Sequence, residues 1–225
     1  MNKGLMWVSR IRLLVQAGVW AGCAMVGGAM IVGCESLDTG MATVAALEAV
    51  QAITLSDDQI RSMSVKAAVV QDQKHQVAPP SSPYVKRLQS LVARHQTEQG
   101  LPLNYKVYLA DDQVNAFAMA DGTVRVYSGL MNILTDEELL FVIGHEVGHV
   151  IRGHSKRAAQ VAYSTSAIRK GATAVGGAVG DLASSELGSI SEKIISAQFS
   201  QHEEKDADDY GLQFLQRHGY NVRAS

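Results

Sequence analysis

Cysteine is almost absent from this sequence. Only Cys23 and Cys34 occur among 225 residues, and both lie in a hydrophobic N-terminal region. If Cys34 becomes the modified first residue of the mature protein, as argued below, no thiol is left to form a disulfide. The fold must then be stabilised by its core alone.

The sequence also lacks an excess of positive charge. Lysine and arginine number 20 against 22 for aspartate and glutamate, which gives a formal net charge of −2. This balance offers no global electrostatic reason to expect a nucleic acid as the partner. Hydrophobic residues make up 47% of the chain, which excludes a disordered protein and allows one domain of ordinary size with a sizeable core.

Proline is scarce, and its distribution suggests the domain organisation. Three of the four prolines fall in residues 76–83, a segment that cannot continue a helix and that we interpret as a linker. We expect a leader over residues 1–33 and a lipidated tether with N-terminal helices and the linker over residues 34–83. The main domain is expected over residues 84–225.

The leader combines charge and hydrophobicity in the order of a secretory signal peptide. Residues 1–12 are cationic, and residues 13–32 are uncharged and apolar. An uncleaved transmembrane anchor is the alternative, because the apolar run is long enough to span a bilayer. Ile31-Val32-Gly33-Cys34 resembles the lipobox of bacterial lipoproteins, so we expect cleavage before Cys34 and lipidation of its thiol. Glu35 then favours anchoring in the bacterial outer membrane, facing the periplasm.

Capping signals and periodicity predict an α+β fold that is mainly helical. Ser56 and Thr135 each begin a capping box, which predicts helices from residue 57 to about Lys74 and from residue 136 onward. Three segments predict a small antiparallel sheet beside the second of these helices: residues 105–109, 115–119 and 123–127. The other expectations are helices over residues 42–53 and from residue 84, a flexible loop or loosely packed helical insertion over residues 171–188, and a last helix from near Ser191 or Ser200 to Gly219.

The helix that begins after Thr135 contains His145-Glu146-Val147-Gly148-His149, an HExxH sequence. Two histidines four residues apart share one face of a helix, so both imidazoles can reach a single Zn²⁺. Glu146 lies between them and can accept a proton from the water that the zinc activates. Burying these groups on an otherwise apolar helix would be costly without a compensating ion. The pattern therefore predicts a catalytic zinc site.

A catalytic zinc usually has a third protein ligand. The candidates lie in residues 201–208 of the last expected helix, where Glu204 and Asp208 are one turn apart. Glu204 could bind zinc while Asp208 accepts a hydrogen bond from a ligand imidazole. Glu203, on a neighbouring face, and His202 are alternatives that periodicity does not exclude.

His154 is a further histidine close to the HExxH sequence. It follows His149 by five positions, which is too far round the helix for the same metal ion. We expect it to be exposed or to lie beside the ligands.

These motifs make the sequence similar to the M48 family of zinc metallopeptidases. The resemblance rests on residues 115–118, 128–130 and 204–208 together with the HExxH sequence, and the lipobox extends it to the outer-membrane lipoprotein proteases of that family. It implies a zincin-like (gluzincin) fold that holds one Zn²⁺ per chain through His145, His149 and Glu204, with Asp208 as the partner carboxylate. It also implies an edge strand that binds the substrate backbone, formed by Asn115, Ala116 and Phe117.

The resemblance implies a membrane-anchored zinc metalloendopeptidase whose partners are polypeptides, with misfolded or damaged cell-envelope proteins as expected substrates. Relatives continue into helices that contribute a His-Pro dipeptide and a later Arg near the cleft. This sequence contains no His-Pro and ends at Ser225, so we expect a minimal member with reduced activity. The alternative function is that of a periplasmic chaperone or assembly factor that uses the protease fold as a scaffold.

Overall fold

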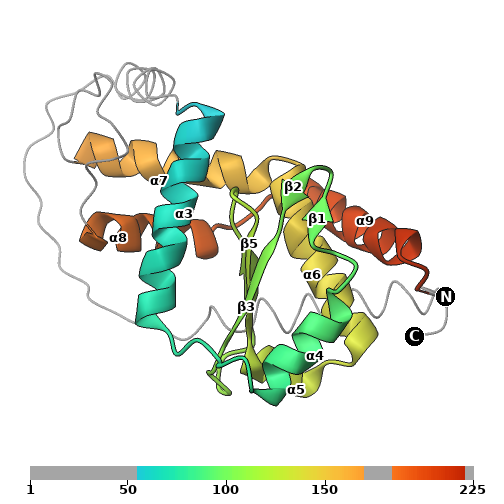
Figure 1. Ribbon diagram of the computed structural model, residues 1–225. Coiled ribbons are helices and arrows are strands. Elements are labelled where there is room, and N and C mark those ends of the chain that lie inside the picture. The colour runs from blue at the N-terminus through green and yellow to red at the C-terminus, as the bar shows by residue number, and fades with distance from the viewer. Residues whose placement is uncertain (1–54, 170–183, 221–225) are drawn as a thin grey trace, which may run out of the picture.

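The computed structural model describes residues 55–169 and 184–220, which form a mainly helical α+β fold (Figure 1). The predicted signal peptide and lipobox and the expected helix over residues 42–53 lie outside the described residues, as does most of the segment 171–188. The elements are, in chain order, α3 (Asp57–Lys74), α4 (Pro83–Leu91), β1 (Thr97–Glu98), β2 (Leu101–Pro102), β3 (Asn104–Tyr108), β4 (Ala116–Ala118), β5 (Thr123–Tyr127), α5 (Ser128–Ile133), α6 (Asp136–Ile151), α7 (His154–Arg169), α8 (Ser184–Ile195) and α9 (Gln201–Arg217).

Three capping boxes set the starts of α3, α6 and α9. Ser56, Thr135 and Ser200 each accept a hydrogen bond from the backbone N–H three residues later, and the side chain of that later residue accepts one from the cap's own N–H. The predicted helices after Ser56 and Thr135 are confirmed, and α3 ends at Lys74 as expected. The last helix begins after Ser200, whereas Ser191 lies within α8.

The three-stranded sheet has the order β3-β5-β4. β4 and β5 are antiparallel, as predicted, and are joined through a turn in which Gly122 has φ 90°. β3 and β5 are parallel, so the prediction of a wholly antiparallel sheet is wrong in this detail. All five residues of β5 are buried, which explains why this last strand takes the central position between the other two.

Helices cover both faces of the sheet (Figure 1). On one face, valines of β3 and β5 join the main hydrophobic core with α6 and α9: Val107, Val124 and Val126. On the other face, aromatic residues from all three strands pack against Ala67 and Ala68 of α3: Tyr108, Phe117 and Tyr127. The sheet is therefore enclosed between α3 and the pair α6 and α9.

Small residues let α6 and α9 pack closely. A Cβ added to Gly148 of α6 would lie 3.0 Å from the Cβ of Tyr210 on α9, and one added to Gly144 would lie 2.9 Å from the Phe214 ring. Glycine is needed where two backbones approach this closely. The contact brings the HExxH segment of α6 beside the first turns of α9.

α3 packs against helices that come much later in the chain. Its buried Ile60 and Met63 join Ala159 of α7 and Ile190 of α8 in a second hydrophobic core. Asp72, near its C-terminal end, forms an ion pair with the buried Arg125 of β5. α3 therefore links the sheet to α7 and α8, although it precedes the proline-containing segment that the sequence suggests as a linker.

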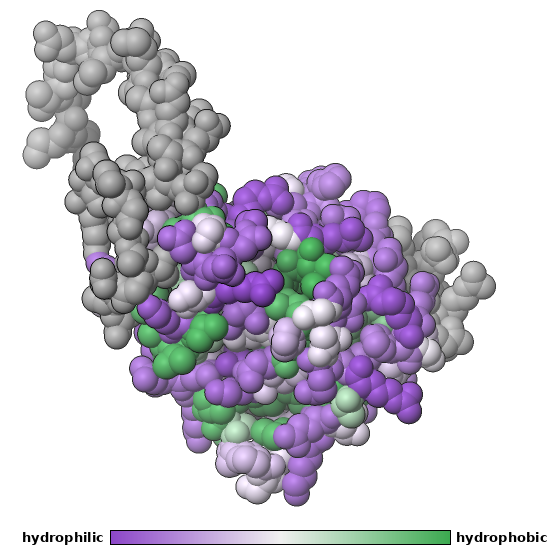
Figure 2. Space-filling view, turned by 45° about the horizontal axis from the view of Figure 1, so that its top comes forward, coloured by the Kyte–Doolittle hydropathy of each residue, from purple (hydrophilic) through white to green (hydrophobic). Residues whose placement is uncertain are grey.

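Hydrophilic side chains cover most of the face in Figure 2, and hydrophobic residues show as small separate patches. Exposed large apolar side chains among the described residues include Val65, Val69, Ile133 and Val161. Scattered residues of this kind occur on most protein surfaces and do not by themselves mark a binding site. Between residues 55 and 169 and between 184 and 220, no helix is both long and apolar enough to cross a bilayer.

Candidate metal centre

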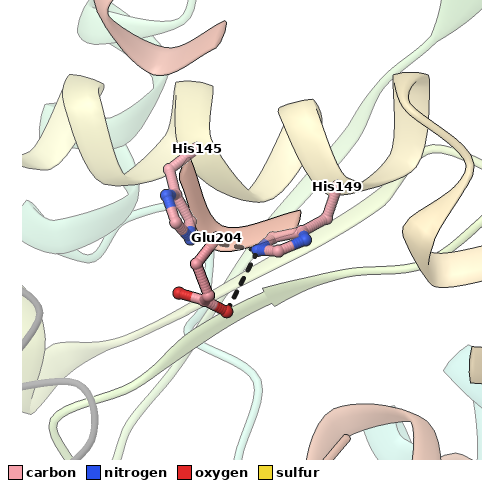
Figure 3. A group of neighbouring side chains, drawn as sticks. All are labelled: His145, His149 and Glu204. Carbon is pink, nitrogen blue, oxygen red and sulfur yellow. Dashed lines mark hydrogen bonds and ion pairs between the residues drawn. The ribbon is translucent and has the colours of Figure 1, made fainter. Parts of the chain in front are cut away.

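His145 and His149 project from the same side of α6 (Figure 3). Their Nε2 atoms are 3.1 Å apart, and only 3% of the His149 side chain is exposed. Burial, together with the neighbouring His145 and His154, lowers the pKa of His149 to about 2, so this imidazole is neutral at physiological pH. A neutral imidazole with a free lone pair is the form that binds metals.

Glu204 points from α9 toward the two histidines (Figure 3). Its Oε1 lies 3.8 Å from His149 Nε2, and the three ligand atoms lie within 4.8 Å of one another. Tetrahedral zinc with bonds of about 2.1 Å places neighbouring ligand atoms about 3.4 Å apart. The observed distances of 3.1 and 3.8 Å lie on either side of that value. Two imidazole nitrogens and one carboxylate oxygen in this arrangement therefore fit Zn²⁺.

The two alternatives to Glu204 are placed elsewhere. Glu203 is the third residue of the capping box, where its carboxylate accepts hydrogen bonds from Ser200 and lies 3.2 Å from the Arg157 guanidinium. His202 is exposed. The structure thus brings Glu204, rather than Glu203 or His202, to the pair of histidines.

Asp208 lies one turn after Glu204 and contacts the other side of His145. The Nδ1 of His145 is 2.9 Å from Asp208 Oδ1. Burial lowers the pKa of His145, but the hydrogen bond to Asp208 and the neighbouring carboxylates outweigh it and raise the pKa above its ordinary value. A proton held on Nδ1 by this carboxylate leaves the Nε2 lone pair directed toward His149 and Glu204.

Glu146, the residue after the first histidine, is half-buried and faces the edge of the sheet. Burial raises the pKa of its carboxyl to about 7, with a further contribution from Glu204, while His145 and a hydrogen bond from the Ala118 backbone act in the opposite direction. A carboxylate with a pKa near neutrality can both accept and return a proton at physiological pH.

Comparisons with known proteins agree with this geometry. The family model described as Peptidase family M48 matches residues 83–225. The chain belongs to peptidase family M48. It is 46% identical to Metalloprotease LoiP and 40% identical to Metalloprotease YcaL, both from Escherichia coli, over 87% of this chain and 78% of each relative. A Beta-barrel assembly-enhancing protease of Yersinia pestis is 30% identical over 83% of this chain and 38% of its own length.

Family membership and the relatives' names make the chain a metalloprotease. The M48 fold expected from the sequence is confirmed in its α+β class and in the position of the sheet beside the HExxH helix. This combination places His145, His149 and Glu204, which could hold a metal ion, next to a sheet edge.

In this M48 protease Ala116 and Phe117 lie in the edge strand β4, and Asn115 directly precedes it. The Asn115 carbonyl accepts a hydrogen bond from the Tyr127 N–H, and within the described residues β4 pairs with β5 on one side only. The side chains of Ala116 and Phe117 are both buried, 5% and 4% exposed. Any contact that these two residues make with a substrate must therefore use the backbone.

Two residues beside the proposed ligands were not placed by sequence reasoning. It did not consider Phe199, and it left two positions open for His154. Phe199 stacks on the His149 ring, with 4.0 Å between ring centroids and 21° between planes. His154 was expected to be exposed or to lie beside the ligands. It is buried, and its Nδ1 lies 3.0 Å from His149 Nδ1, so the second expectation is confirmed. The sequence feature that could have indicated the position of His154 is Gly153. Its φ of 78° turns the chain back just after α6 ends.

Proposed function

We propose that the chain is a zinc metalloendopeptidase, held at the bacterial outer membrane by a lipidated Cys34 and facing the periplasm, that cleaves polypeptides of the cell envelope. The observation that carries the proposal is the convergence of His145, His149 and Glu204 within 4.8 Å, with Glu146 beside them. The family, in which relatives are named metalloproteases, supports the peptidase activity.

The donor set fits one zinc ion, held by the two imidazoles and Glu204. When bound there, zinc supplies a Lewis acid that polarises the scissile carbonyl and increases the acidity of water. Asp208 holds the His145 imidazole by accepting from its Nδ1. The Glu146 carboxylate, whose pKa is raised by burial, would take the proton from the attacking water and then deliver it to the leaving amine.

The edge of the sheet supports binding of an extended polypeptide. Within the described residues β4 pairs with a strand on one side only, so the part of its other edge before Ala118 offers backbone groups with which a substrate strand can pair, as in other cases of strand addition. Glu146 accepts a hydrogen bond from the Ala118 backbone at the end of this strand. A peptide that pairs with β4 would therefore pass beside the proposed base.

Envelope substrates and lipid anchoring rest on the sequence and on the names of relatives. The resemblance of residues 31–34 to a lipobox supports lipidation of Cys34, and several acyl chains on one residue would give stable attachment, because each buried methylene contributes about 0.8 kcal/mol. The Yersinia pestis relative is named for enhancing β-barrel assembly, and such barrels are proteins of the outer membrane. We therefore propose that unassembled or damaged envelope proteins are the substrates.

A casein cleavage assay with and without a metal chelator tests the proposed activity. We expect cleavage that the chelator abolishes and that added Zn²⁺ restores. Protection of an unfolded client from aggregation, without cleavage and without sensitivity to chelator, would instead favour the chaperone function.

The proposed anchor is tested separately by metabolic labelling with palmitate. Label in the wild-type protein should be lost in Cys34→Ala, while Cys23→Ala should keep it. Labelling that persists in Cys34→Ala would contradict the lipobox interpretation without affecting the proposed activity.

A further inference from the structure

The second metal-binding histidine has a partner of an unusual kind. His145 is held through Nδ1 by the carboxylate of Asp208, at 2.9 Å. His149 is held through Nδ1 by another imidazole, that of His154, at 3.0 Å. His154 is the first residue of α7 and is 3% exposed, so water does not compete for this contact.

The positions of the ring nitrogens determine where the protons must lie. His149 Nε2 faces His145 Nε2 and Glu204, so this nitrogen must present a lone pair to a metal ion. The proton of a neutral His149 is then on Nδ1, and it can be donated only to an acceptor. His154 Nδ1 must therefore carry a lone pair, which places the His154 proton on Nε2.

The surroundings of His154 agree with that arrangement. Its Nε2 lies 3.8 Å from Asp206 Oδ2, on the side away from His149. Asp206 also faces the Arg152 guanidinium at 3.9 Å, and Arg157 is paired with Glu203. A carboxylate therefore lies on the N–H side of His154, where it is shared with Arg152, while Arg157 has a separate carboxylate partner in Glu203.

Two contacts fix the His149 ring in different directions. The stacked Phe199 ring covers one face of His149 and limits tilting of the imidazole. The contact of His149 Nδ1 with His154 limits rotation of the ring about the Cβ–Cγ bond. Partners that orient ligand imidazoles in this way commonly change metal affinity by about 10- to 100-fold when they are removed.

We propose that His154 is a positioning residue for the metal centre: its Nδ1 accepts the Nδ1–H of His149 and so directs His149 Nε2 toward the ion. His154 does not bind the metal itself. The proposal rests on the proposed zinc site and adds to it the residue that orients its second ligand.

The test measures the zinc dissociation constant of the full-length protein by competition with a chromophoric chelator. His154→Phe keeps a ring but removes the acceptor, and we expect zinc binding about 10- to 100-fold weaker. His154→Asn places a carbonyl oxygen near the position of Nδ1 and should restore most of the affinity. The matched control is His202→Phe, which changes an exposed histidine on α9 and should leave zinc binding unchanged.

The tautomers provide a second measurement that needs no variant. In histidine-selective ¹⁵N NMR spectra of the zinc-loaded wild-type protein, His149 should show a proton on Nδ1 and His154 a proton on Nε2. A His154 proton on Nδ1 would overturn the proposal even if His154→Phe fails to fold.

The results separate this inference from the proposed function. Wild-type zinc affinity in His154→Phe, or equal losses in His154→Phe and His154→Asn, would overturn the role of His154 and leave the zinc site intact. Failure of the wild-type protein to bind one zinc would instead overturn the proposed function.

Discussion

At the scale of single residues, three acidic side chains at the start of α9 have three different partners. Glu203 caps its own helix and pairs with Arg157, Glu204 faces His149, and Asp208 holds His145. The helical period explains these different partners. Glu203 and Glu204 are adjacent and point in different directions, whereas Glu204 and Asp208 are one turn apart and point in similar directions. Two neighbouring glutamates can therefore be tested against each other.

Glu204→Ala should lose zinc, because two imidazoles without the carboxylate form an incomplete site. Glu203→Ala should keep zinc and lose its capping-box hydrogen bonds with Ser200 and its ion pair with Arg157, at a cost of about 1 kcal/mol in unfolding free energy. Zinc content after gel filtration and urea denaturation measure the two effects. The assignment of the third ligand would be wrong if Glu203→Ala lost the metal and Glu204→Ala kept it.

The pH dependence of stability depends on a carboxylate far from the metal centre. Burial tends to raise the pKa of Asp72, but hydrogen bonds from Arg125, Lys106 and Tyr108 outweigh it and hold the pKa below its ordinary value. The folded-state pKa is thus below the unfolded value, so the stabilisation is present at neutral pH. It is lost as the pH falls below about 4.

Asp72→Asn should reduce the unfolding free energy at pH 7 by about 3 kcal/mol, because it leaves Arg125 buried without its counter-charge. It should also reduce the loss of stability below about pH 4, since the titrating group is gone. Urea denaturation at several pH values measures both. Asp58→Asn, on the exposed side of α3, is the matched control and should leave the profile unchanged.

Some of these residue roles can be predicted from sequence and others cannot. The HExxH pair is fixed by a local period, so its geometry follows from forming one helix. The choice between Glu203 and Glu204 depends on how α9 is rotated against α6, which is a property of tertiary packing. Ser200 and Glu203 nevertheless form a capping box. This sequence pattern could have been used to predict that Glu203 caps the start of α9.

At the scale of elements, the close packing of α6 on α9 positions Glu204, the proposed third ligand. Gly148→Ala would place a Cβ 3.0 Å from the Tyr210 Cβ, so the two helices must separate. We expect a loss of about 1–3 kcal/mol in unfolding free energy and weaker zinc binding, because Glu204 moves with α9. Thermal unfolding and chelator competition check both effects.

Gly188→Ala is the matched control, since it changes a glycine inside α8. The added Cβ would meet the flexible end of Lys74, at 2.9 Å from Nζ. We expect unchanged zinc affinity and equal or greater stability, because alanine is favoured over glycine in a helix by about 1 kcal/mol. Equal effects of the two substitutions would contradict the account of the α6 and α9 contact.

The sheet shows the limit of element prediction. Strand composition located residues 104–108 and 123–127 well, because β-branched and aromatic residues are enriched in strands. It did not reveal that these strands are parallel, since side-chain alternation carries no information on order or direction. Every residue of β5 is buried, as is typical of the central strand of a covered sheet.

At the scale of the whole molecule, the family match begins at residue 83, whereas the packed structure includes α3 from Asp57. α3 covers the aromatic face of the sheet and supplies Asp72 to Arg125. We therefore expect residues 84–225 alone to lack a cooperative thermal transition and to bind a hydrophobic dye, whereas residues 55–225 should unfold cooperatively. Val65→Ala, a change at a half-exposed position of α3, should have little effect. A cooperative transition at the same temperature in both fragments would contradict this view.

In the proposed mechanism, Glu146 is the base for peptide hydrolysis at a zinc held by His145, His149 and Glu204. The most direct measurement determines zinc content and casein cleavage in wild-type protein and in Glu146→Gln. The account predicts one zinc per chain in both and cleavage in the wild type alone, because glutamine cannot accept the proton. Chelator-sensitive cleavage that persists in Glu146→Gln would contradict it.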